Sequence, residues 1–221
     1  MKLSEHTLTV LKNFSSINSS VVLQPGKIQK TLSVDQSVMV EAELPDEFPV
    51  KYGIYDLNQF LGNINALDKP DLEFNDNQVI MNNGSMSLCY HGCSPDLISN
   101  PGDKTLTLPN SDVEFALQNL TLTKLLKLAT MNDLDFLSVS VSGGEVKVTI
   151  HNDTKGTNMA SIVVGNIPDT EKTGEFKFKT TKLQLLPYDY KVSISAGKFG
   201  VFENDTHKIK YFISLESRKK Q

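Results

Sequence analysis

The sequence predicts an α+β protein of two similar domains, in which helices lie on one face of antiparallel sheets. Much of its 221 residues alternates between apolar and polar side chains, which is typical of half-buried strands. Four segments instead carry apolar residues at helical spacing. The order of helices and strands in the first half recurs in the second, and this repeat predicts two similar domains.

The four helices are predicted from apolar stripes and from residues that begin or end a helix. Ser4 is a candidate N-cap for the first helix, because its side chain can accept a hydrogen bond from a free backbone N–H. Pro187 ends the fourth helix, because proline cannot continue one. The predicted helices span residues 4–14, 55–64, 121–131 and 181–186.

Strands are predicted between these helices. The first half has a meander, a single strand and three further strands, at residues 21–43, 48–54 and 72–90. The second half has the same set at residues 136–164, 175–179 and 188–216. Gly143-Gly144 predicts a two-residue hairpin turn inside the second meander.

The two predicted domains span residues 1–107 and 108–221. A connector at about residues 94–110 joins them, because this stretch is rich in Pro, Gly, Asn and Asp.

The composition is that of an ordinary globular protein, with 39% hydrophobic and 22% charged residues. The amino-terminal segment has no apolar signal region, and no run approaches the roughly 18 apolar residues of a membrane span. We therefore expect a cytosolic protein with reduced thiols and no membrane contact.

Charge is distributed unevenly along the chain, whose net charge is −4. Residues 1–110 hold 7 basic residues against 13 acidic ones, a net charge of −6. Residues 111–221 hold 15 against 13, a net charge of +2. An acidic protein can still bind DNA if its lysines gather on one face.

No enzyme motif accounts for the sequence. It contains no Walker loop, no dinucleotide-binding glycine motif and no HExxH pair. A hydrolase that used Asp56 or His91 would need further catalytic side chains to act with them, and the sequence shows no such set. Cys89, His91 and Cys93 offer up to three metal ligands, but structural zinc usually takes four, so free thiols at a strand end are favoured. We expect no catalytic residue, metal or cofactor.

Lysines recur on the predicted polar faces of the helices. Lys124 and Lys127 lie opposite the apolar stripe of the third helix, and Lys12 lies on the polar side of the first. Lys179 and Lys182 flank the start of the fourth helix. One such face is usually just solvated, but four basic or neutral faces in an acidic protein favour binding of a phosphate backbone. A single arginine, Arg218, accompanies the lysines, as loose backbone contact would favour.

Several short strings of the sequence match one known family in register. In residues 1–65 they are Met1-Lys2-Leu3-Ser4, Leu11-Lys12-Asn13-Phe14, Ile17-Asn18-Ser19, Ile54-Tyr55-Asp56-Leu57-Asn58 and Phe60-Leu61-Gly62. Weaker matches are Leu125-Leu126-Lys127, Tyr190-Lys191-Val192 and Ile213-Ser214-Leu215-Glu216. On these strings the chain resembles the sliding clamps of T-even-type bacteriophages, the DNA polymerase processivity factors.

The resemblance implies a two-domain protomer of the DNA-clamp fold, three of which form a ring around duplex DNA in the cytoplasm of the infected host. It implies as partners the DNA polymerase, an ATP-dependent clamp loader and late-transcription factors. Lys12 and Lys127 match basic positions that face the hole, whereas Thr130 stands where the family has a basic residue. Tyr90 matches a bulky aromatic residue near the subunit interface.

A partner-binding pocket is expected on the second domain near the connector, with apolar rim residues that otherwise only tether the domains. The candidates are Leu97, Ile98, Leu106 and Leu108. The competing interpretation is a virion structural subunit of tandem β-rich domains, which gives no reason for lysines on helix faces.

Overall fold

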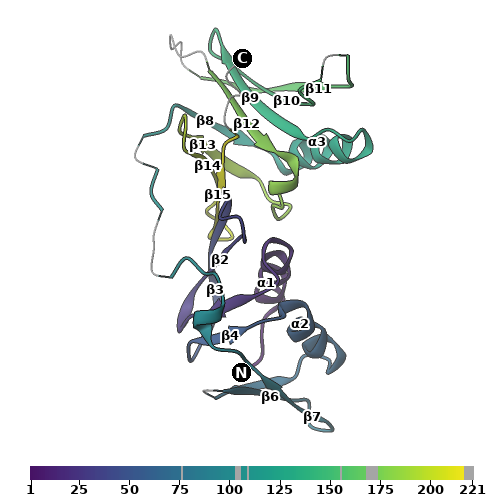
Figure 1. The fold of residues 1–221 in the computed structure, drawn as a ribbon, viewed down its shortest axis with the longest axis vertical. Helices are drawn as coiled ribbons and strands as arrows, with labels where there is room; N and C mark the ends of the chain where they lie inside the picture. Colours follow the sequence, from purple (N-terminus) through teal and green to yellow (C-terminus); the bar gives the residue numbers. More distant parts are fainter. Residues whose placement is uncertain (76, 103–105, 109, 155, 168–173, 217–221) are drawn as a thin grey trace. The chain divides into compact units, whose positions relative to one another are not determined.

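The computed structural model describes residues 1–221 except 76, 103–105, 109, 155, 168–173 and 217–221 (Figure 1). The chain forms two compact units. Unit 1 comprises Met1–Lys104 with His207–Ile209, and unit 2 comprises Thr105–Thr206 with Lys210–Gln221. Each unit combines helices with antiparallel sheets, so the predicted α+β fold class of two similar domains is confirmed.

Unit 1 begins with a helix and ends with a three-stranded sheet. Its elements in order are α1 (Glu5–Ile17), β1 (Val21–Leu23), β2 (Gly26–Leu32), β3 (Val38–Phe48), β4 (Tyr52–Ile54), α2 (Leu57–Ala66), β5 (Asp71–Phe74), β6 (Gln78–Asn82), β7 (Ser87–His91) and the 3-10 turn η1 (Pro95–Leu97). The antiparallel pairs are β1 with β4, β2 with β3, and the set β5-β6-β7. Helix α1 packs on β3 and on α2 (Figure 1).

Unit 2 repeats this order. Its elements are β8 (Val113–Leu117), α3 (Asn119–Met131), β9 (Phe136–Ser142), β10 (Glu145–His151), β11 (Ala160–Asn166), β12 (Gly174–Lys179), the 3-10 turn η2 (Thr180–Lys182), β13 (Tyr190–Ile194), β14 (Phe199–Asn204) and β15 (Ile209–Ser214). One sheet has the order β11-β10-β9-β12, and β8, β13, β14 and β15 are consecutive in another. Helix α3 packs on β10 (Figure 1).

The repeat extends to a strand that precedes each helix. In unit 2, β8 pairs with β13, the first of the last three strands. In unit 1, Met1 occupies the equivalent place beside β5: its amino group donates to Leu72 O at 2.6 Å and its carbonyl accepts from Leu72 N at 2.7 Å. Strand β8 was not predicted from the sequence.

Local sequence explains where the helices begin. The Ser4 hydroxyl accepts a hydrogen bond from Thr7 N, which confirms the predicted N-cap of α1. Asp56 caps α2 through Gln59 N at 2.9 Å. The predicted Gly143-Gly144 hairpin turn is also confirmed, with both glycines at positive φ and Glu145 paired with Ser142.

The predicted fourth helix is wrong: only the turn η2 forms. The Thr180 hydroxyl and N–H donate to the carbonyls of Leu134 and Asp135 and so hold the start of this segment beside the chain that precedes β9. Farther along, Leu186 N–H donates to the Tyr211 hydroxyl at 3.2 Å, and the Tyr190 hydroxyl donates to Leu186 O at 2.6 Å. Because two tyrosines satisfy this backbone, the segment before Pro187 needs no helical hydrogen bonds.

The predicted strand 48–54 is also wrong in extent. β3 ends at Phe48, and β4 begins only at Tyr52, where it pairs with β1. Gly53 of β4 lies so close to the chain after β7 that a Cβ atom would sit 2.4 Å from Cys93 O. A glycine is therefore required there, and the bridge between Gly53 and Cys93 fixes the start of the connector on unit 1.

The hydroxyl of Tyr211 is predicted to stabilise unit 2. Tyr211→Phe leaves the buried Leu186 N–H without its acceptor, which should lower the free energy of unfolding by about 1–3 kcal/mol. Urea unfolding followed by circular dichroism measures the change. The matched control is Tyr55→Phe, at a residue that is 72% exposed, and its stability should change by no more than about 0.5 kcal/mol. Equal stability of the two variants would contradict the assigned role.

Candidate nucleic-acid interface and partner pocket

The free face of α3 is basic. Leu122, Leu125 and Ala129 are buried, at 4%, 5% and 3% exposure, and turn the opposite face toward solvent. Lys124 and Lys127 are exposed on that face. The helix contains no acidic residue, so nothing within α3 neutralises the two ammonium groups. Such a face attracts phosphate groups by point charge, without the fixed geometry that reads bases.

Apolar side chains flank these lysines on the same helix. Leu120, Leu128 and Met131 are 64%, 41% and 71% exposed. Thr130, where the resemblance leads one to expect a basic residue, turns its hydroxyl back to Leu126 O at 3.0 Å. The exposed face of α3 therefore combines two lysine ammonium groups with apolar surface. Neither kind of group imposes a fixed geometry on a ligand that contacts it.

The helices of unit 1 present a nearly neutral surface. A groove of about 510 Å³ lies between α1 and α2, lined on one side by Thr9 and Lys12 and on the other by Asn58 and Asn65. Helix α2 has no charged residue. At the rim Lys69 pairs with Glu5 at 2.5 Å, and this hydrogen bond raises the pKa of the Lys69 ammonium. Unit 1 thus offers Lys12 together with amide and hydroxyl groups.

The two lysines near η2 differ from each other. Lys179 is exposed. Lys182 is only 16% exposed, and its ammonium contacts Glu216 Oε1 at 2.7 Å and Ser214 Oγ at 3.2 Å. Its charge is neutralised inside unit 2 by a residue 34 positions away, which the sequence pattern does not reveal. Arg218 lies outside the described residues.

Tyr90 contributes to the core of unit 1. It lies on β7 at the edge of a sheet, yet it is 8% exposed and its ring packs edge-on against Phe60, with centroids 5.1 Å apart. Its hydroxyl donates to Asp56 O at 3.3 Å. Burial raises the pKa of Tyr90 and raises that of neighbouring Tyr52, which donates to Tyr90 O, to about 12. The side chain of Tyr90 is thus buried inside unit 1, and Tyr90 reaches the sheet edge only through its backbone in β7.

Each unit has an edge strand whose outer side is unpaired within its sheet. In the β5-β6-β7 sheet of unit 1 this strand is β7, because Met1 occupies the far side of β5. In the β11-β10-β9-β12 sheet of unit 2 it is β11, because Glu216 N bonds to Lys177 O at the other edge, β12. Strand β11 also exposes Ile162 and Val163, at 41% and 47%. Unpaired strands of this kind favour association with another chain.

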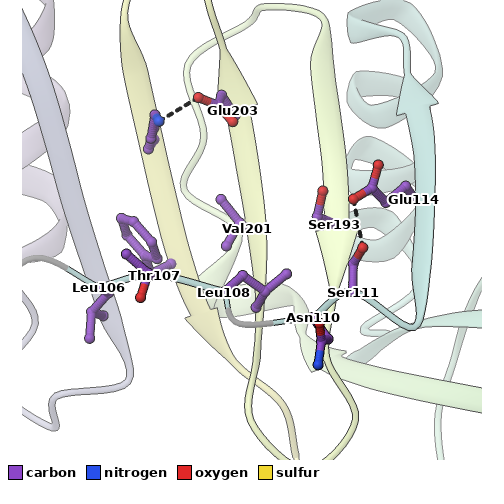
Figure 2. A pocket seen from close by; sticks show the side chains of 11 residues that line it. Leu106, Thr107, Leu108, Asn110, Ser111, Glu114, Ser193, Val201 and Glu203 are labelled. Atoms are coloured by element: carbon purple, nitrogen blue, oxygen red, sulfur yellow. Dashed lines mark hydrogen bonds and ion pairs between the residues drawn. The ribbon is translucent and has the colours of Figure 1, made fainter.

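A pocket of about 600 Å³ lies in unit 2 between the connector and the sheet (Figure 2). Its lining residues are Leu106, Thr107, Leu108, Asn110, Ser111, Glu114, Ser193, Val201, Glu203, Lys210 and Phe212. Two of the four predicted partner-binding residues, Leu106 and Leu108, line it. The other two belong to unit 1, where Leu97 is 75% exposed and Ile98 is 5% exposed.

The acidic groups of this pocket are paired. Glu114 accepts a hydrogen bond from Ser111 Oγ at 2.6 Å and contacts the Lys191 ammonium at 3.3 Å. The Ser111 hydrogen bond, followed by the lysine, holds the pKa of the Glu114 carboxyl below its ordinary value. Glu203 pairs with Lys210 at 2.5 Å. The walls are therefore close to neutral and suit an uncharged ligand group.

The remaining titratable residues form no cluster among the described residues that could hold a metal ion. Cys89 and Cys93 are free thiols, and Cys89 Sγ lies 3.8 Å from His91 Nε2. No three His, Cys, Asp or Glu side chains in the described part gather around a common point. The sequence did not predict that Ser138 Oγ lies 2.7 Å from His151 Nε2, but His151 Nδ1 faces the Asn152 carbonyl rather than a carboxylate.

Comparison with known families covers both units. The family of the DNA polymerase processivity factor matches residues 2–85, and the family described as gp45 sliding clamp, C terminal, matches residues 114–217. The chain belongs to the phage sliding-clamp family. Two clamp relatives support this over the whole length. The sliding clamp of Vibrio phage KVP40 is 28% identical, over 98% of this chain and 100% of the relative. That of Enterobacteria phage T4 is 26% identical, over 98% and 97%.

Solved structures show the same clamp fold. The Proliferating Cellular Nuclear Antigen of Entamoeba histolytica aligns with a TM-score of 0.70 and 15% identity, over 98% of each chain. The A. fulgidus PCNA aligns with a TM-score of 0.73 and 10% identity, over 99% of this chain and 98% of that one. No helix in the described part of this clamp-family chain has the length and hydropathy that a membrane crossing requires.

Chemical acetylation should separate the free lysines from the paired one. Lys124 and Lys127 should react fast with an N-hydroxysuccinimide acetate, whereas Lys182 should react several-fold more slowly, because Glu216 and burial protect its ammonium. Peptide mass spectrometry over a time course measures the rates. Glu216→Gln should raise the rate at Lys182 and leave Lys124 unchanged. Equal rates at Lys124 and Lys182 in the unmodified protein would refute the difference in accessibility.

Proposed function

We propose that this chain is a sliding clamp that encircles duplex DNA and tethers the replicative DNA polymerase to its template. The observation that carries the proposal is the match of clamp families to both units, residues 2–85 and 114–217. The basic, acid-free face of α3 supports it independently. The alternative of a virion structural subunit has no support, because the relatives are clamps.

The proposed mechanism uses topology rather than affinity. A clamp must not recognise bases, because specific contacts would stop it from sliding. Lys124 and Lys127 supply point charges toward phosphates, and the amides and hydroxyls of the α1/α2 groove add short-range contacts. Lys12 and Lys179 are proposed to face the DNA as well. Lys182 would contribute little, since Glu216 neutralises it. The chain is proposed to be non-catalytic and to need no cofactor.

The proposed assembly is a closed homotrimer. A ring forms when β11 of one copy pairs with β7 of the next, because this head-to-tail contact uses different edges and repeats around an axis. The exposed Ile162 and Val163 of β11 would be covered in that contact. Tyr90 would support it indirectly by holding β7 on unit 1. Strand pairing of this kind buries the free N–H and C=O groups that otherwise invite aggregation.

Ile162→Lys is predicted to weaken the ring. The substitution places a charge on the uncovered edge of β11, so the population should shift from trimer toward the 24.5 kDa monomer on dilution. Sedimentation velocity over a dilution series measures the shift. The control is Val34→Lys, at a position that is 80% exposed in unit 1, and it should assemble like the unmodified chain. If the unmodified chain remained monomeric at tens of micromolar protein, that result would contradict the proposed ring.

The proposed partners follow from the clamp function. They are the DNA polymerase, an ATP-dependent loader that opens the ring, and late-transcription factors, all in the cytoplasm of the infected host. Short peptides of these proteins are proposed to bind the pocket of unit 2 beside Leu106 and Leu108. Leu97 is exposed near the start of the connector and lies outside this pocket.

The lysines of α3 are predicted to control the salt dependence of DNA binding. Lys124→Ala with Lys127→Ala should weaken binding of the ring to DNA at low salt. The slope of log affinity against log salt should become shallower, by about 0.9 for each phosphate that is no longer neutralised. Folding should be unaffected, because the buried stripe of α3 is unchanged. Processive synthesis with the loader and polymerase should fall.

The matched control removes the same charge elsewhere. Lys27 and Lys51 are exposed and lie outside the helices, so replacing both by Ala should leave the salt slope and processivity nearly unchanged. If the two double variants behave alike, the α3 face does not line the DNA channel. Retention tests the topology directly: the assembled ring should stay on circular DNA and dissociate when that DNA is cut.

A further inference from the structure

Two apolar side chains of unit 2 are buried on a sheet face where the other strand residues that line the pocket are polar, and Phe199 packs edge-on against one of the two, Phe212, with ring centroids 5.9 Å apart. Val201 of β14 and Phe212 of β15 are 7% and 6% exposed. They line the pocket together with Ser193, Glu203 and Lys210 from the same sheet. Polar side chains of this kind normally lie in water, so the apolar surface of Val201 and Phe212 that Phe199 does not contact needs a further cover.

The connector supplies that cover. Figure 2 shows Leu106, Thr107, Leu108, Asn110 and Ser111 beside the strands that carry Val201 and Ser193. Leu108 is half-buried there, whereas Leu106 keeps 38% of its surface exposed. The two leucines therefore occupy the apolar part of a pocket that still has about 600 Å³ of space beside them.

The described residues of the connector beside Val201 and Phe212 are held there by side-chain packing. Among the described residues, Leu106, Thr107, Leu108 and Asn110 make no hydrogen bond to the strands beneath them. The first bonds come later, from Ser111 Oγ to Glu114 and from Asp112 N to Ile194 O at 2.7 Å. A segment without backbone bonds can move off the sheet by giving up its apolar packing alone.

We propose that Leu108 is an internal plug of the partner pocket, and that a bulky apolar side chain of an extended partner peptide replaces it on Val201 and Phe212. This inference rests on the proposed function of the pocket and adds its regulation. An uncharged apolar anchor suits the pocket, because the acids of the pocket are already paired with Lys191 and Lys210. The backbone of the connector, freed from the sheet, can then pair with the extended peptide.

The plug lowers the apparent affinity for the peptide. A site that is open in only a fraction of molecules binds more weakly by that fraction. Removing the plug should therefore tighten binding, by about tenfold if one molecule in ten is open in the unmodified protein. A residue that merely formed part of the pocket wall would have the opposite effect when truncated, because the peptide would have less apolar surface to pack on.

The test uses the assembled protein and two probes. The first is the dye 8-anilinonaphthalene-1-sulfonate, whose fluorescence rises on uncovered apolar surface. The second is a synthetic peptide copied from the carboxy terminus of the cognate DNA polymerase, titrated by calorimetry. Leu108→Ala should bind more dye than the unmodified protein and should bind the peptide more tightly. Leu97→Ala is the matched control, since Leu97 is 75% exposed and lies in unit 1, and it should change neither.

The plug itself can be followed by fluorescence, because the chain contains no tryptophan. In Leu108→Trp the indole should emit at short wavelength in the free protein and shift to longer wavelength as the peptide saturates. Unchanged dye binding in Leu108→Ala, or weaker peptide binding, overturns the plug. Increased dye binding without any peptide binding leaves Leu108 as a cover but refutes the exchange, and it separately refutes the partner assignment of the pocket.

Discussion

Helices α1 and α3 each pack an apolar stripe on a neighbouring sheet, and the need to bury this stripe decides where the lysines of the two helices point. In unit 1, Val10, Leu11 and Phe14 of α1 are fully buried. In unit 2, Leu122 and Leu125 of α3 do the same over β10. Because an α-helix has one apolar stripe, its opposite face must then point away from the sheet. Lys124 and Lys127 are free to meet a ligand for that reason alone.

The same constraint leaves the sheet edges free. A helix covers the face of a sheet but cannot satisfy the N–H and C=O groups of its outermost strand. In each of the sheets β5-β6-β7 and β11-β10-β9-β12, one edge is satisfied by another part of the unit: Met1 bonds to β5, and Glu216 bonds to β12. The opposite edges, β7 and β11, have no strand on their outer side within the sheet. The proposed ring uses both features for one function: the open edges close it, and the basic helix faces line it, so that it stays on DNA without specific contact.

The two units differ in their second helical element, although the order of their elements is similar. The second helix of unit 1 is a full α-helix with neutral amides on its free face. Its counterpart in unit 2 is the single turn η2, in which Lys182 forms an ion pair with Glu216. The positive charge of the described helices is thus concentrated on α3, and the connector packs its leucines on unit 2 beside the pocket. Unit 2 thus carries both the most basic helix face of the described residues and the pocket.

The sequence by itself determined the features that depend on neighbours within a few residues. The stripe of α3, the cap at Ser4 and the turn at Gly143-Gly144 are local, because helix periodicity, capping and hairpin geometry each act over a few positions. The same locality placed Lys124 and Lys127 correctly on the exposed face of α3. The recurrence of the element order was enough to predict two similar domains.

Only the tertiary structure decided the features that join distant residues. Lys182 meets Glu216, Tyr90 turns onto Phe60, and the hydroxyl of Tyr211 replaces a helical hydrogen bond at Leu186. No local pattern encodes these contacts, because each partner is brought close by packing rather than by spacing along the chain. A lysine that looks free in the sequence is therefore free only if the fold places no carboxylate beside it.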